Sequence, residues 1–145
     1  MAVKAKAAGK VGLSKEERDA MKETMRERAR QAAGEDGEAA VMAAIKAMAP
    51  ADRGLAERLH KLVRSTAPGL TCRTWYGMPA YADGDRVVVF FKAAQKFKER
   101  YATLGFNQHA KLDDGRMWPT SFGLTGIGPA EEKAIVALVK KAAGA

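Results

Sequence analysis

Cysteine and histidine are scarce in this chain of 145 residues, which has one cysteine and two histidines. Cys72 has no partner for an intrachain disulfide, as is typical of proteins kept in a reducing compartment. His60 and His109 lie far apart, so the spacing of a zinc site is absent, and we expect His60 at the surface or at the boundary of the core. Since no Gly-x-Ser-x-Gly motif is present either, the sequence offers no recognisable catalytic residues, and we expect no enzymatic activity.

Long apolar runs are also missing. None approaches the roughly 20 residues that cross a bilayer, and the Ala- and Lys-rich residues 1–10 lack the apolar centre of a secretory signal. We therefore expect a cytoplasmic protein that makes no membrane contact. Hydrophobic residues still make up 47% of the chain, which is enough for the core of one domain.

Acidic residues are outnumbered by basic ones, at 17 against 25, which gives a formal net charge of +8. Half of this excess lies within residues 1–33, where basic residues recur at four-residue spacing with acids three positions away. This pattern is typical of a solvated surface helix, so nucleic acid is not an expected partner. In the alternative, the segment is an accessory element that contacts nucleic acid or a protein partner. The residues that would make this contact are Arg18, Lys22, Arg26 and Arg30.

The chain is expected to divide into a disordered basic tail, a charged N-terminal helix and a folded domain. The helix should begin after Ser14, because Ser14 and Glu17 match the pattern of a capping box. Met21 and Met25 lie one turn apart and supply a thin apolar seam for shallow packing. The expected bounds of the three segments are 1–13, 14–36 and 37–145.

Two helices with apolar stripes are expected to open the folded domain. The first should cover residues 38–48 and the second residues 51–65. The Ala49-Pro50 pair separates them, because proline lacks an N–H and disfavours helix in the residue before it. The residues expected to face the core are Val41, Ile45, Met48, Leu55, Leu59, Leu62 and Val63.

After Pro68 the pattern changes to strands separated by turns. A turn is expected at Gly77-Met78-Pro79, and Asp83-Gly84-Asp85 is a tight hairpin signal. The segment Arg86–Lys92 is apolar on both faces, which favours a place in the middle of a sheet. Strands are expected over 70–76, 80–82, 86–92, 100–105 and 117–125, and a last helix over 130–143. The sequence thus predicts an α+β fold, a two-layer sandwich in which helices cover an antiparallel sheet of about five strands.

Aromatic residues make up only 7% of the chain, yet several of them cluster around Gly77. Core packing, the wall of a ligand pocket and an interface are all consistent with such a cluster, because tyrosine and tryptophan combine a large apolar body with a polar tip. A pocket of this kind would make the protein a small-molecule-binding domain. The candidate ligand-binding residues are Trp75, Tyr76, Met78, Tyr81 and Trp118.

Two compact acidic pairs lie outside the expected helices, each beside a glycine. Turn chemistry accounts for such pairs, because aspartate favours turns. The alternative is a site for a hard cation or ferrous iron, since carboxylate oxygens and an imidazole are suitable ligands. The candidate metal-binding residues are Asp83, Asp85, His109, Asp113 and Asp114.

Three segments resemble the YdhG-like family of small bacterial domains: Trp75–Tyr81, the strand Arg86–Phe91 and the late helix led by Gly128-Pro129. The Tyr-Gly-Met-Pro turn followed by a strand is the hallmark, and the resemblance extends over about residues 38–143. It implies a frataxin-like α/β fold, and it implies for some members an intracellular iron-chaperone role. On this resemblance we expect a small, non-enzymatic binding protein, and iron is the one cofactor that the family suggests.

Overall fold

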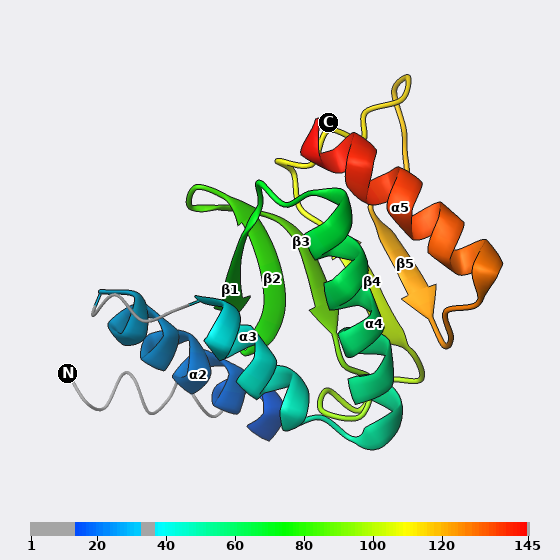
Figure 1. Cartoon of the computed structure of the whole chain (residues 1–145). Helices are drawn as coiled ribbons and strands as arrows, with labels where there is room; N and C mark the ends of the chain where they lie inside the picture. The colour runs from blue at the N-terminus through cyan, green and yellow to red at the C-terminus, as the bar shows by residue number, and fades with distance from the viewer. Residues whose placement is uncertain (1–13, 33–36, 145) are drawn as a thin grey trace.

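The computed structural model describes residues 14–32 and 37–144, so the expected disordered tail over residues 1–13 lies outside the described residues. The chain runs from two N-terminal helices through a third helix and a sheet to a C-terminal helix (Figure 1). The helices are α2 (Lys15–Ala32), α3 (Gly37–Lys46), α4 (Pro50–Thr66) and α5 (Pro129–Ala143). The strands are β1 (Thr71–Trp75), β2 (Met78–Asp83), β3 (Arg86–Lys92), β4 (Ala102–Phe106) and β5 (Ser121–Leu124).

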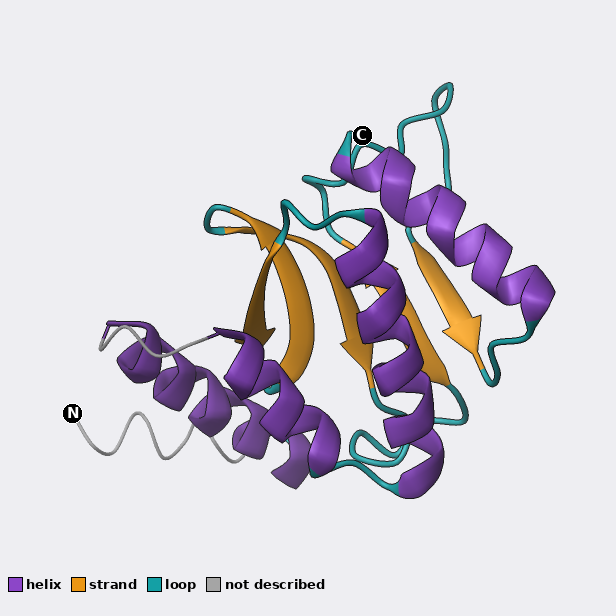
Figure 2. Ribbon diagram, viewed as in Figure 1, coloured by secondary structure: helices purple, strands orange, loops and turns teal. Residues whose placement is uncertain are grey.

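The five strands form one sheet in the order β1-β2-β3-β4-β5, and every neighbouring pair is antiparallel. Helices α3, α4 and α5 lie on one face of this sheet (Figures 1 and 2). The predicted α+β fold is therefore confirmed, and β3 is the central strand as expected. No helix in the described ranges is both long enough and apolar enough to cross a membrane.

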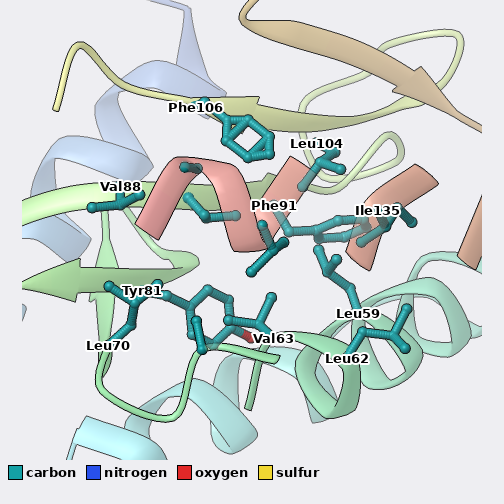
Figure 3. Packing of buried hydrophobic residues seen from close by; sticks show 14 of the residues in the cluster. Leu59, Leu62, Val63, Leu70, Tyr81, Val88, Phe91, Leu104, Phe106 and Ile135 are labelled. Atoms are coloured by element: carbon teal, nitrogen blue, oxygen red, sulfur yellow. The ribbon is translucent and has the colours of Figure 1, made fainter. Parts of the chain in front are cut away.

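The core lies between the sheet and the three covering helices. Figure 3 shows side chains of α4 and α5 facing those of the strands. Each helix contributes one buried stripe, and the residues at its centre are at most 3% exposed. The innermost helix residues are Val41, Ile45, Leu59, Val63, Ile135 and Val139, and the innermost sheet residues are Tyr81, Val89, Phe91 and Leu104.

The first hairpin turn differs from the prediction. Instead of Gly77-Met78-Pro79, the turn residues are Tyr76 and Gly77, with φ angles of 52° and 78°. Met78 and Pro79 belong to β2 and pair with Trp75 and Thr74. A two-residue turn with positive φ at both positions fits the right-handed twist of the flanking strands, which is why the hairpin closes one residue early.

A register shift lies between Tyr81 and Ala82, where β2 pairs with β3. Tyr81 pairs with Val89 and Ala82 pairs with Val87, so β3 has one residue more than β2 at this point. The extra residue, Val88, is 3% exposed and belongs to the core. This β-bulge is the reason that successive residues of β3 are buried together.

Helix α2 begins at the predicted capping box. The N–H of Ser14 donates to Oε1 of Glu17 at 2.9 Å, and the N–H of Glu17 donates to Oγ of Ser14 at 3.1 Å. These two bonds satisfy backbone donors that the first turn of a helix leaves without partners.

The predicted methionine seam of α2 is wrong. Met21 is 51% exposed and Met25 is 71% exposed, whereas the small side chain of Ala20 is buried at 7%. An ion pair of 2.8 Å between Lys98 Nζ and Glu16 Oε2 also attaches the helix. Among the described side chains of α2, Ala20 is the buried one, charged residues make further contacts with the domain, and the two methionines face away.

Candidate ligand cleft

A cleft of about 850 Å³ lies between α2, α3, the start of α4, the end of β1 and the loop after β3. Alanines of α3 form one wall, and they recur at positions i, i+3, i+4 and i+7, which lie on a single helix face. Their short side chains leave room that longer residues would fill. The wall consists of Ala40, Ala43, Ala44 and Ala47, and the other lining residues are Glu23, Met48, Ala49, Asp52, Thr74, Gly77, Ala93, Gln95 and Lys96.

Asp52 brings a buried carboxylate to this cleft. It lies in the first turn of α4 and is only 6% exposed. Its Oδ2 accepts a hydrogen bond of 3.0 Å from the N–H of Gln95, which ties the loop after β3 to the start of α4. A carboxylate can accept about four hydrogen bonds, so this group retains acceptor capacity toward the cleft.

Thr74 adds a buried hydroxyl group. It pairs with Pro79 in the sheet, its side chain lies on the helix-covered face, and the residue is 5% exposed. The hydroxyl makes no hydrogen bond with another described residue, although every fully enclosed side-chain nitrogen or oxygen among these residues has a partner. The Thr74 hydroxyl therefore reaches the cleft, and a ligand or water there would satisfy it.

Charged groups of both signs lie at the end of the cleft next to the turn between β1 and β2. Lys96 Nζ donates to the carbonyl oxygen of Gly77 at 3.4 Å, and Glu23 Oε1 pairs with Arg26 Nη1 at 3.1 Å. Gly77 leaves space for both side chains, because a Cβ at this position would lie 2.6 Å from Lys96 Nζ and 3.1 Å from Cγ of Glu23. The glycine also has a positive φ of 78°, which disfavours other residues here.

The structure does not bring the predicted aromatic residues into one pocket. Tyr81 pairs with Cys72 and faces the helices, where it is 1% exposed. Trp75 pairs with Met78 and lies on the opposite face of the sheet, next to Phe90 with ring centroids 5.2 Å apart. Residues that lie on opposite faces of a sheet cannot line the same pocket.

The remaining ligand candidates have separate surroundings. Tyr76 is 40% exposed in the first hairpin turn and meets Trp75 edge to face, with ring centroids 5.0 Å apart. Met78 is buried in β2. Trp118 lies in the loop before β5 and packs, half-buried, against the core. These positions support packing roles for the aromatic residues rather than a shared site.

The metal candidates come together only in part. Asp83 and His109 line one hollow of about 270 Å³, together with Lys111, whose positive charge opposes cation binding. Asp85, in the second hairpin turn, is exposed. The exposed pair Asp113-Asp114 lies in the loop between β4 and β5. Among the described residues, no group of three or more histidine, cysteine, aspartate or glutamate side chains could hold a metal ion.

The basic candidates of the N-terminal helix lie on α2. Arg18 and Lys22 are exposed, and Arg26 forms the ion pair with Glu23 that the sequence spacing predicted. The side chain of Arg30 lies outside the described residues. An acid three positions away thus neutralises at least one of the four basic residues.

His60 is 7% exposed and therefore buried, whereas a surface or boundary position was expected. Its Nδ1 lies 2.9 Å from the hydroxyl oxygen of Tyr81, and its Nε2 lies 3.0 Å from Oε2 of Glu38. Burial raises the pKa of the Tyr81 hydroxyl above its usual range, and the neighbouring Cys72 thiol raises this pKa further. The chain of contacts joins α3, α4 and β2, and it runs from the buried Tyr81 and His60 to the exposed side chain of Glu38.

Sequence reasoning missed the two polar residues of the cleft, Asp52 and Thr74. An aspartate in the first turn of a helix has an ordinary reason to be there, because it suits the helix dipole. A threonine in a strand is equally ordinary. The alanine stripe of α3 is the one signal that could have pointed here, since small residues on one helix face leave a neighbouring space.

No protein-family model matches the chain, and no curated protein or solved structure matches it either. The resemblance to the YdhG-like family therefore stays a prediction.

Proposed function

We propose that this protein is a non-enzymatic, small-molecule-binding domain whose ligand occupies the cleft between α2 and α3. The observation that carries the proposal is that the buried carboxylate of Asp52 and the Thr74 hydroxyl, which has no hydrogen-bond partner among the described residues, line one cleft. A ligand in the cleft could hydrogen-bond to this hydroxyl in place of water. The volume of about 850 Å³ falls within the range of small-molecule sites.

The lining favours a ligand with an apolar body and a hydrogen-bond-donating head. The alanine wall offers apolar surface, while Asp52 offers a buried carboxylate acceptor near the start of α4. An ammonium group would pair with that carboxylate, and the Thr74 oxygen offers another acceptor in the same cleft. A primary amine on a compact apolar skeleton is therefore the expected class of ligand.

Three molecules with one skeleton test the preference for the head group: phenethylamine, 2-phenylethanol and 3-phenylpropionate. Each is titrated into the ¹⁵N-labelled protein, and the amide shifts of Ala44, Thr74 and Gln95 are followed. We expect the amine to shift these amides at the lowest concentration and the carboxylate at the highest. Equal or absent shifts for all three molecules would contradict the proposal.

Replacement of Thr74 by valine separates ligand binding from folding. Thr74→Val removes a hydroxyl that has no partner, so we expect the free energy of unfolding without ligand to stay equal or rise, while amine binding weakens about tenfold. Thr71→Val is the matched control, because the Thr71 hydroxyl donates to the carbonyl oxygen of Ala82 at 3.2 Å. This control should lose stability and leave amine binding unchanged.

Iron binding is the second candidate function. It is supported by the resemblance to the YdhG-like family and by the hollow that Asp83 and His109 share. Two protein ligands are few for iron, so we expect affinity for Fe²⁺ no tighter than about micromolar. Anaerobic calorimetry on the wild type, Asp83→Asn/Asp85→Asn and Asp113→Asn/Asp114→Asn tests this candidate. Absence of a heat of Fe²⁺ binding in the wild type would contradict an iron-binding function.

A further inference from the structure

On the face of the sheet that α3, α4 and α5 leave uncovered, one row of residues runs across all five strands, and its members Ala80 and Gly105 are buried beside larger side chains. Cross-strand pairing aligns one residue from each strand in this row, and three of the five have very small side chains. The row reads Arg73, Ala80, Phe90, Gly105 and Ser121. Such a surface differs from the packed face, where large apolar side chains meet the helices.

Aromatic rings lie directly on the glycines of this face. A Cβ at Gly105 would come within 2.2 Å of the Phe90 ring, and a Cβ at Gly123 would come within 3.0 Å of the Tyr101 ring. The Phe90 ring in turn lies 5.2 Å from that of Trp75. The glycines therefore let aromatic rings lie close to the backbone, and Tyr101 remains 41% exposed.

Basic side chains lie on the same face of the sheet as these aromatic rings. Arg73 and Lys92 share the face through the alternation of β1 and β3, and the Arg100 guanidinium lies 4.9 Å from the centre of the Tyr101 ring. Lys92 also pairs with Glu99 at 2.8 Å. A hollow of about 450 Å³ lies beside Tyr101, and its floor includes Thr103, Ser121 and Gly123, besides Glu99 and Arg100 at the side.

We propose that this uncovered sheet face binds single-stranded nucleic acid, with bases stacked on Tyr101 and Phe90 and phosphates paired with Lys92 and Arg100. Flat aromatic rings beside cationic side chains are the combination that single strands require, since every base has a stacking face and every linkage has a negative charge. The net charge of +8 attracts the same partner. The surface is distinct from the basic stripe of α2 and from the ligand cleft.

Fluorescence anisotropy with labelled twelve-residue oligo(dT) and oligo(rU) tests this proposal on the full chain. At 50 mM salt we expect a dissociation constant on the order of 10 μM for the single strands and weaker binding of a duplex of equal length. Two phosphate contacts predict a slope of about −1.4 when the logarithm of the association constant is plotted against the logarithm of salt concentration.

Substitutions at exposed positions test which surface binds the nucleic acid without destabilising the fold. Tyr101→Ala should weaken binding about tenfold through lost stacking, and Arg100→Gln should weaken it severalfold. Arg116→Gln is the matched control, because Arg116 is an exposed arginine in the loop between β4 and β5 and carries the same charge. The control should change the dissociation constant less than about twofold.

Three results would overturn the proposal. The first is absence of binding at about 100 μM protein and 50 mM salt, where even non-specific electrostatic binding is measurable. The second is equal weakening by Arg100→Gln and Arg116→Gln together with no effect of Tyr101→Ala. The third is complete competition by polyglutamate at equal charge concentration, which would indicate an acidic protein partner.

Discussion

The hydroxyl oxygen of Tyr81 lies 2.9 Å from Nδ1 of His60, in the layer between the sheet and α4. Tyr81 is 1% exposed, so water cannot replace this contact. On the other side of the imidazole, Glu38 connects α3 to the same pair, and its Oε2 lies 3.9 Å from Nε of Arg64. This chain of polar contacts, buried at Tyr81 and His60 and exposed at Glu38, orients α3 and α4 on the sheet.

Removal of the Tyr81 hydroxyl is expected to destabilise the fold. Tyr81→Phe leaves Nδ1 of His60 buried without its partner, which should lower the free energy of unfolding by about 1–3 kcal/mol. Tyr76→Phe is the control, because Tyr76 is 40% exposed and its hydroxyl can bond to water. Urea unfolding of both variants gives the comparison. A loss below about 0.5 kcal/mol in Tyr81→Phe would mean that the contact does not hold the layers together.

Stability should also fall in alkaline solution. Burial raises the pKa of Tyr81 in the folded state, whereas the unfolded chain keeps an ordinary value near 10. The stabilising contribution is therefore complete below about pH 10 and is lost as the pH rises from there toward the folded-state pKa. Thermal melts between about pH 8 and 12 should decline less steeply for Tyr81→Phe than for Tyr76→Phe. Parallel curves would show that Tyr81 ionises equally in both states.

The two apolar sides of β3 should respond differently to a charge. Val88 is 3% exposed in the core, so Val88→Asp should prevent folding or cost more than about 4 kcal/mol. Phe90 is half-buried on the uncovered face, where a carboxylate can reach water, so Phe90→Asp should cost less. Circular dichroism and urea unfolding measure both. The reverse order would place Val88, rather than Phe90, on the solvent side.

Helix α2 should open before the rest of the fold. Its described anchors are the buried Ala20 and the exposed ion pair between Lys98 and Glu16, and exposed pairs contribute little. Hydrogen exchange should therefore release the amides of residues 18–26 well before those of Val87–Phe91. Protection of equal strength in both segments would contradict this weak attachment.

Much of the fold follows from periodicity. The bounds of β3 agree with the prediction at both ends, because β-branched and aromatic residues run continuously from Val87 to Phe91, with one basic residue on each side. The helices α4 and α5 were predicted to within one residue, since proline and glycine mark their ends. These element boundaries can be predicted from neighbouring residues alone, without information about contacts between distant parts of the chain.

The cleft and the surroundings of each side chain depend on the register in which the strands pair, and this register cannot be predicted from neighbouring residues alone. Trp75 and Tyr81 belong to one aromatic cluster in the sequence, but the early turn pairs Trp75 with Met78 and sends the two rings to opposite faces. The burial of His60 was not predicted, because its partners Tyr81 and Glu38 are about 20 residues away in the sequence. Asp52 and Thr74 meet only after three elements have packed together.

Filling the cleft tests the central claim most directly. Ala44→Leu places a larger side chain on the wall of the cleft, whereas Ala39→Leu makes the same change at an exposed position of the same helix. The measurement is the dissociation constant of phenethylamine from ¹⁵N chemical shifts in both variants and the wild type. We expect Ala44→Leu to weaken binding at least tenfold and Ala39→Leu to leave it unchanged. Equal binding in all three proteins would contradict a ligand site between α2 and α3.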